Sequence, residues 1–129
     1  GRRRTPAGPD VTTARRTRLG VLLLVLGVAA ASSVWQSARQ ATLGARVAAL
    51  AGPGDLRMIS SDHCGICVQA RQWFERHGVA FSECSIERDA ACAATFEALR
   101  APGTPVILVR GQPVLGFDPQ RLHRQLEGG

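Results

Sequence analysis

The apolar positions near the start of the chain form one continuous stretch. Residues 19–38 contain no charged side chain, and this uncharged run of 20 residues would span about 30 Å as a helix, the thickness of the hydrocarbon core of a membrane. Residues 19–28 are apolar on every side of such a helix, which argues against a buried helix in a soluble domain. We therefore expect a transmembrane anchor or an export signal at 19–38.

Both of these interpretations stay open. The alanines at 29–31, followed by Ser32 and Ser33, resemble a small-residue signal-peptidase site after a basic region. The uncharged run continues past that site, however, and the basic region before it is long. We favour a retained anchor over a cleaved signal for these two reasons.

The pattern changes after the apolar run. Residues 39–51 are rich in alanine, with the larger apolar residues at helical spacing, and Gly-Pro-Gly at 52–54 then breaks the chain. We expect a spacer helix and a hinge over 39–54, followed by a separate domain over 55–129.

Short apolar strands alternate with amphipathic helices in this last segment. Gly78 is placed to stop the first helix, while Asp89 and Asp118 are placed to cap the next two at their N-termini. The expected elements are strands at 56–60 and 79–86 around a helix at 64–77, then a helix after Asp89, strands at 106–109 and 114–117 joined by a turn at 111–113, and a helix from 119. This order, βαβ-αββα, predicts a compact α/β domain.

Charge is distributed unevenly along the chain. The net charge is +6, of which residues 1–18 carry +5, residues 19–54 carry +2 and residues 55–129 carry −1. The α/β domain is therefore close to neutral, and we expect no nucleic-acid partner. The basic excess before the apolar run predicts a cytoplasmic tail at 1–18 and an extracytoplasmic location from Gln40 onward, which is periplasmic in a bacterium.

The strongest chemical signal is Cys64-Gly-Ile-Cys67, placed between a strand and a helix. A cysteine at a helix N-terminus faces unpaired N–H groups and the positive end of the dipole, which stabilise its thiolate. Cys64 is therefore the expected nucleophile. Cys67 lies on the same helical face as Ala70 and Phe74 and points inward, within bonding reach of Cys64, as suits a resolving thiol.

Two other interpretations of this pair remain, a metal site and a static disulfide. His63 is adjacent and would modulate the thiolate or join Cys64 and Cys67 around a soft ion such as Cu(I) or Zn(II). The sequence has one C-x-x-C and no second pair at ligand spacing, so we favour a redox pair and expect no bound metal. Gly65 and Ile66, between the cysteines, are expected to modulate their reactivity.

Over residues 56–126 the chain resembles the glutaredoxin family of the thioredoxin-like superfamily. The resemblance implies that fold, with a four-stranded mixed sheet in the order βαβ-αββα behind the N-terminal hydrophobic helix. It also implies thiol–disulfide exchange without a cofactor beyond the dithiol. The segments that carry the resemblance are the C-x-x-C, Gly-Val-Ala-Phe-Ser-Glu-Cys-Ser-Ile-Glu-Arg-Asp at 78–89, Gly-Thr-Pro-Val-Ile-Leu-Val at 103–109 and Leu-Gly-Phe-Asp-Pro at 115–119.

The resemblance also implies substrate-binding residues. Pro105 would be a cis-proline facing the cysteines, with the main chain of Thr104 free to pair with a substrate; an ordinary trans bond is the alternative. Asp118 would receive the amino group of glutathione, although a helix cap is an equal role for it. Residues 60–63 lack the basic residue that family members using glutathione carry. Protein disulfides are therefore the expected substrates, with glutathione as a doubtful co-substrate.

Cys84 and Cys92 are the remaining cysteines, on apolar faces of a predicted strand and helix. Proximity outside the cytoplasm would favour their oxidation. Both residues also suit core packing as small hydrophobes, and we favour two buried thiols over a second disulfide.

The sequence thus predicts a monomeric, membrane-tethered thiol–disulfide oxidoreductase that acts on protein thiols and disulfides outside the cytoplasm. Two alternatives belong to other classes of protein: a metal-delivery module using Cys64, Cys67 and His63, and a non-catalytic adaptor with the same fold.

Overall fold

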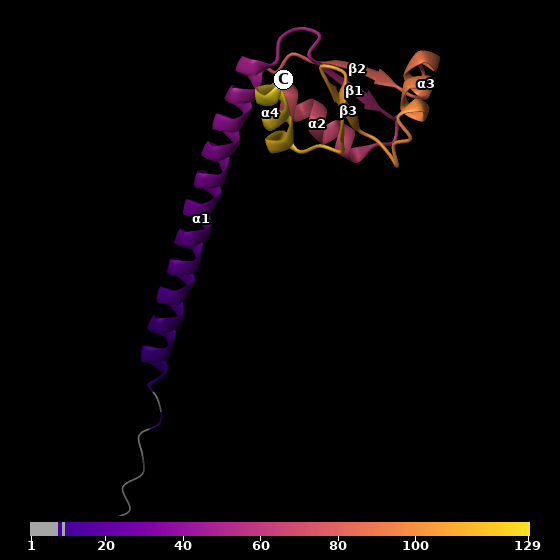
Figure 1. Cartoon of the computed structure of the whole chain (residues 1–129). Coiled ribbons are helices and arrows are strands. Elements are labelled where there is room, and N and C mark those ends of the chain that lie inside the picture. Colours follow the sequence, from indigo (N-terminus) through magenta and orange to yellow (C-terminus); the bar gives the residue numbers. More distant parts are fainter. Residues whose placement is uncertain (1–7, 9) are drawn as a thin grey trace, which may run out of the picture. The chain divides into compact units, whose positions relative to one another are not determined.

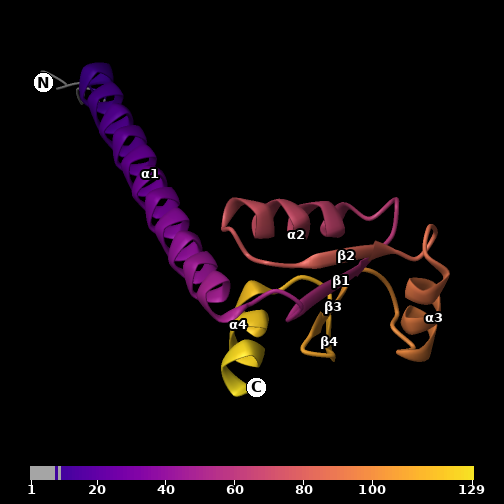
Figure 2. The same ribbon diagram turned by 90° about the horizontal axis from the view of Figure 1, so that it is seen from above.

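The computed structural model describes residues 8 and 10–129, which form four helices and one sheet (Figures 1 and 2). The chain divides into two compact units, of which the first ends at Ala38 and the second spans Arg39–Gly129. The elements are α1 (Val11–Leu50), β1 (Leu56–Ser60), α2 (Gly65–Arg76), β2 (Ser82–Ser85), α3 (Ala90–Ala98), β3 (Val106–Val109), β4 (Gln112–Leu115) and α4 (Pro119–Gly128). From β1 onward this is the predicted order βαβ-αββα.

The first unit contains the N-terminal part of α1. Among the described residues, α1 is the one helix long and apolar enough to cross a membrane, judged by length and composition. The apolar side chains of its uncharged segment, from Leu19 to Trp35, are exposed. An exposed apolar helix of this kind fits an anchor or a signal segment. Of the basic tail expected at 1–18, residues 1–7 and 9 lie outside the described residues, and residues 11–18 form the start of α1.

The sheet has four strands in the order β2-β1-β3-β4, with β1 parallel to β2 and antiparallel to β3, and β3 antiparallel to β4. It is the expected mixed sheet. Successive side chains of a strand point to opposite faces, so Met58 and Ile107 face one side and Ile59 and Val106 face the other. All four are fully buried, which makes β1 and β3 the centre of the domain.

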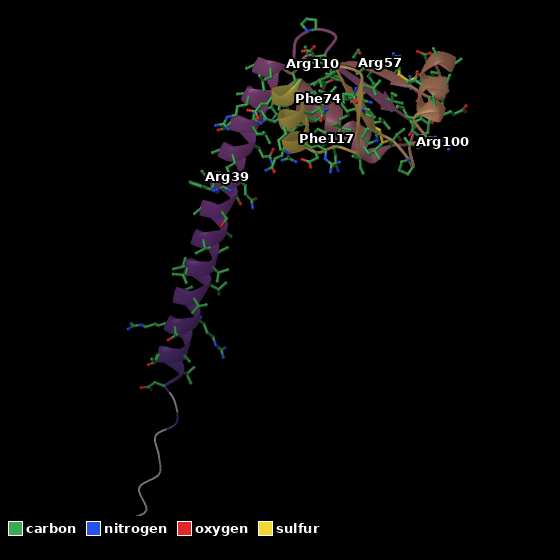
Figure 3. The ribbon with its side chains drawn as sticks, in the orientation of Figure 1. Arg39, Arg57, Phe74, Arg100, Arg110 and Phe117 are labelled. Carbon is green, nitrogen blue, oxygen red and sulfur yellow. A yellow bond between two sulfur atoms is a disulfide. The ribbon has the colours of Figure 1, made fainter. Side chains whose placement is uncertain are left out.

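A different set of helices covers each face of the sheet. On one face, Phe74 of α2 packs edge-on against Phe117, with ring centroids 5.7 Å apart (Figure 3). Leu122 and Leu126 of α4 complete that cluster, as the amphipathic pattern predicts. On the other face, α3 supplies Cys92 to a smaller cluster around Ile59 and Val106.

The β3–β4 hairpin differs from the prediction by two residues. Val109 pairs with Gln112, so the turn is Arg110-Gly111 and β4 is Gln112–Leu115 rather than 114–117. Both turn residues have positive φ, 49° and 85°, as a two-residue hairpin turn of type I′ requires. Pro113 fits within β4 because an edge strand need not use every N–H for pairing.

The strand β2 is shorter than the predicted 79–86. Gly78 ends α2 with φ of 63°, and the Val79 N–H donates to Phe74 O at 2.9 Å. Val79 is therefore part of the helix termination, and extended pairing with β1 starts only at Ser82, opposite Arg57.

The end of α1 belongs to the second compact unit. Val47 is fully buried in the main core, Ala51 is 5% exposed there, and Leu43 packs against the same cluster. Trp73 Nε1 of α2 donates to Gln40 Oε1 at 3.4 Å. Residues 39–51, expected to be a spacer, therefore contribute apolar side chains to the domain's own core.

Hydrogen bonds close the Gly-Pro-Gly turn where a hinge was expected. Gly52 N–H donates to Asp55 Oδ2 at 2.9 Å, and Arg110 donates to Leu50 O at 3.4 Å and to Leu126 O at 3.2 Å. The Gly52 N–H and the Arg110 guanidinium lower the pKa of Asp55 below its ordinary value. Arg110, labelled in Figure 3, thus places a cation at the carboxyl ends of α1 and α4.

The packing of α1 on α2 leaves no room for a side chain at Gly44. A Cβ there would collide with Cβ, Cγ and Nδ1 of His77. His77 is itself packed against Trp73, with ring centroids 4.6 Å apart, so it has little freedom to move aside.

We predict that Gly44→Ala lowers the free energy of unfolding by about 1–3 kcal/mol, because the added methyl overpacks this contact. Urea denaturation of the full chain in detergent micelles measures it, with Trp73 fluorescence as the probe in a Trp35→Phe background. Gly52→Ala is the matched control: its Cβ would lie 3.6 Å from Asp55 Oδ2, an ordinary contact, and we expect a change below about 1 kcal/mol. Equal stability of the two variants would contradict the close packing of α1 on His77.

Candidate active site

Cys64 stands at the junction of β1 and α2, as its position in the sequence predicts. It is the N-cap of α2, with extended backbone angles of φ −109° and ψ 101°, and its Sγ accepts the Cys67 N–H at 3.0 Å. Cys64 and Cys67 form a disulfide with their Cα atoms 5.2 Å apart. The sulfur of Cys64 therefore lies where unpaired N–H groups of a helix favour negative charge.

The two cysteines differ in exposure. Cys67 is fully buried and shares the inward face of α2 with Ala70 and Phe74, whereas Cys64 is partly exposed. A thiol partner can therefore approach Cys64 more easily than Cys67. This asymmetry is the one expected for an attacking and a resolving thiol.

The loop before β3 carries a cis peptide bond between Thr104 and Pro105, as the family resemblance implies. Pro105 is fully buried, and Gly116 N–H donates to its carbonyl at 2.9 Å. Thr104 Oγ1 lies 2.8 Å from Ser61 Oγ, in the segment that leads to Cys64. This hydroxyl pair links the loop of the cis-proline to the loop of the cysteines.

The neighbours of the cysteines are exposed. His63, Gly65 and Ile66 all face solvent, with Ile66 51% exposed. Within the described part of the chain, no group of three or more His, Cys, Asp or Glu side chains is placed to hold a metal ion. The structure therefore does not bring His63 together with Cys64 and Cys67 as a ligand set, and the modulating roles of these neighbours stay predictions.

Asp118 caps α4. Its Oδ1 accepts the N–H of Gln120 at 3.0 Å and of Arg121 at 3.2 Å, and Pro119 occupies the first helical position. These contacts are the capping role that the sequence predicts. Its other predicted role, in binding substrate, stays a prediction.

A polar network behind the cysteine loop was not predicted. Ser85 Oγ lies 2.9 Å from Asp62 Oδ1 and 2.8 Å from Glu87 Oε2. The Asp62 N–H donates to Glu87 Oε2 at 3.1 Å, and Arg88 pairs with Asp62 at 2.9 Å. The network ties the residues just before Cys64 to the end of β2. The sequence signal that could have predicted the network is the βαβ order, because parallel pairing of β1 and β2 places the residues that follow both strands at one edge of the sheet.

The preference for buried thiols at Cys84 and Cys92 was wrong. The two residues form a second disulfide with Cα atoms 6.1 Å apart. Cys84 pairs with Ile59 in the sheet register, and Cys92 packs in the first turn of α3 against the same Ile59. The two cysteines therefore meet in one small apolar cluster. The strand and helix patterns of the sequence do not predict this contact, because they do not say where α3 packs on the sheet.

An ion pair joins α2 to the edge strand beside this disulfide. Arg71 donates to both carboxylate oxygens of Glu83, at 2.7 and 2.5 Å. These bonds lower the pKa of Glu83 below its ordinary value, with a smaller contribution from Ser60, and they raise the pKa of Arg71.

Known proteins resemble this domain. The family model that describes glutaredoxins matches residues 56–114. A point mutant of the thioredoxin-like protein BC3987 is 23% identical with a TM-score of 0.51, over 57% of this chain and 96% of that one. Glutaredoxin from Archaeoglobus fulgidus is 20% identical (TM-score 0.47, 57% and 87% covered), and wheat glutaredoxin is 18% identical (TM-score 0.47, 67% and 92% covered). Comparison with curated proteins gave no match. The likeness to BC3987 shows a thioredoxin-like fold.

We predict that the bond between Ser61 and Thr104 contributes about 1 kcal/mol to stability. Ser61→Ala and Thr104→Val should each lower the free energy of unfolding, and the double variant should lose little more than either one, because both remove the same bond. Ser82→Ala, at an exposed position of β2, is the control and should change stability by less than about 0.5 kcal/mol. Fully additive losses in the double variant would show that the two hydroxyls are not coupled.

Proposed function

We propose that this chain is a thiol–disulfide oxidoreductase that works through Cys64 and Cys67, because the family model that describes glutaredoxins matches residues 56–114. The observation that carries the proposal is the disulfide between these residues at the N-terminus of α2. A disulfide at this position joins one partly exposed cysteine to one buried cysteine, which supports an order of exchange in which Cys64 reacts with the substrate first.

The proposed reaction has two steps. In the reduced protein, the Cys64 thiolate attacks one sulfur of a substrate disulfide, and the other substrate sulfur leaves as a thiolate that takes a proton from solvent. The Cys67 thiolate then attacks Cys64 Sγ, releases the second substrate thiol and forms the Cys64–Cys67 disulfide. Two electrons pass from the dithiol to the substrate, and the reverse sequence oxidises a substrate dithiol.

Proteins are the proposed substrates. Thr104 lies two residues before β3, next to Pro105, so its main chain would be placed for an extended substrate segment to pair beside Cys64, in the manner of an added strand. Glutathione has less support, because residues 60–63 contain no arginine or lysine and Asp118 Oδ1 already accepts two N–H bonds from α4.

We propose that residues 19–38 remain as a membrane anchor and that the domain lies outside the cytoplasm. The support is the long apolar helix and the excess of arginine before it. A cleaved signal segment would deliver the domain to the same side without the tether.

We predict that Cys64→Ser lowers the rate of exchange with a model disulfide peptide by about two orders of magnitude or more, because the attacking sulfur is lost. Cys67→Ser should instead accumulate a mixed disulfide on Cys64, because nothing resolves it. Mass spectrometry of the acid-quenched full chain in detergent micelles detects both results. Full exchange by Cys64→Ser together with loss of exchange by Cys67→Ser would reverse the two roles.

A second prediction concerns topology. Alkaline phosphatase fused after Gly129 should be active in a bacterial host, because that enzyme folds only outside the cytoplasm, and the fusion should stay in carbonate-washed membranes at its full mass. Replacing the six arginines of residues 1–18 by glutamine should reduce this activity, because the charge that orients the helix is lost. A soluble mature chain beginning near Ser32 would favour the signal-peptide alternative, and an inactive fusion would contradict the proposed sidedness.

A further inference from the structure

The second disulfide lies beside a polar groove at the edge of the sheet. The groove has a volume of about 540 Å³, within the range of small-molecule sites. Cys84 lines it together with two serines, two arginines and two carboxylates: Ser60, Ser85, Arg71, Arg88, Glu83 and Asp89. The two arginines balance the two carboxylates, and they are paired with Glu83 and with Asp62 outside the groove, respectively, so the groove is polar without a large net charge. We call it the β2 groove.

The two cysteines of this disulfide differ in exposure. Cys84 is partly exposed and lines the β2 groove, whereas Cys92 is fully buried between α3 and the sheet. Cys92 also lies in the first turn of α3, where its own N–H and that of Ala91 are held by Asp89. A thiol entering from the groove therefore meets Cys84 first, and Cys92 becomes the leaving group.

We propose that Cys84–Cys92 is a second site of thiol–disulfide exchange, which a low-molecular-weight thiol reaches through the β2 groove by attack on Cys84. The thiolate forms a disulfide with Cys84 Sγ while the Cys84–Cys92 bond breaks, and the electron pair stays on Cys92, which takes a proton from solvent. A second thiolate then attacks the small-molecule sulfur of that mixed disulfide and releases Cys84. The protein gains two electrons, and the two thiols leave as one disulfide.

Reduction at this site would loosen α3. Cys92 is the only buried residue of that helix, and the disulfide is its covalent link to the sheet. The cluster around it contains Ile59 and Val106, from the strands that carry the cysteine loop and the cis-proline. Reduction of the second disulfide would therefore change the packing of Ile59 and Val106, and through these strands the support of the Cys64–Cys67 loop.

The test uses the full chain in detergent micelles with Cys64→Ser and Cys67→Ser already in place, so that it does not depend on the proposed function. In this background, Cys92→Ala leaves a single thiol at Cys84, and Cys84→Ala leaves a single thiol at Cys92. Oxidised glutathione is the probe, and mass spectrometry follows the mixed disulfide. We expect Cys84 to react about tenfold faster than Cys92 in native buffer and at the same rate in urea, because access sets the difference.

A second measurement leaves the Cys84–Cys92 pair intact. Reduced glutathione or dithiothreitol should reduce it at concentrations where Trp73 fluorescence stays native, again in a Trp35→Phe background. Reduction only together with unfolding, or reaction of Cys92 as fast as that of Cys84, would overturn the proposal. If either single-thiol variant fails to fold, the experiment with the intact pair decides alone.

Discussion

The antiparallel register of β1 and β3 is the constraint on which the site depends. Ile59 pairs with Val106, so the end of β1 and the start of β3 lie at the same edge of the sheet. The chain leaves the end of β1 toward Cys64, and it enters the start of β3 from Pro105. A shift of this register by one residue would move Met58 and Ile107 out of the main core, so burial of the strands also positions the cysteine loop beside the cis-proline.

The helices hold this edge from both faces. On one face the apolar side of α2 fixes Cys67 inward and leaves Cys64 at the helix N-terminus, with α4 and the end of α1 completing the core. On the other face α3 contributes one fully buried residue, Cys92, with partly buried Phe96 beside it, and the second disulfide links the helix to the sheet. The two disulfides therefore differ in position: Cys64–Cys67 lies at the N-terminus of α2, and Cys84–Cys92 links α3 to the sheet beside the β2 groove.

Many elements of the fold could be predicted from the sequence, because their signals lie in neighbouring residues. The apolar runs of β1 and β3 and the caps at Asp89 and Asp118 carry their signals in neighbouring residues, and their elements formed where expected. The misplaced features depend on distant partners. The hairpin turn moved to Arg110-Gly111 because the pairing of β4 with β3 decides it, and the disulfide at Cys84 required the position of α3 on the sheet. The core contact of Val47 was missed because an alanine-rich helix gives no sign of what it packs against.

We infer that Cys64 and Cys67 form a reversible two-electron couple within a domain that stays folded. The most direct measurement equilibrates the full chain in dithiothreitol buffers of graded potential, from both the oxidised and the reduced side. Alkylation and peptide mass spectrometry then report each cysteine pair, with a metal assay on the same samples. We expect Cys64–Cys67 to exchange two electrons at one potential, identical from both sides, while the fold persists. A pair that stays oxidised until the domain unfolds, or reduced thiols protected by stoichiometric metal, would contradict it.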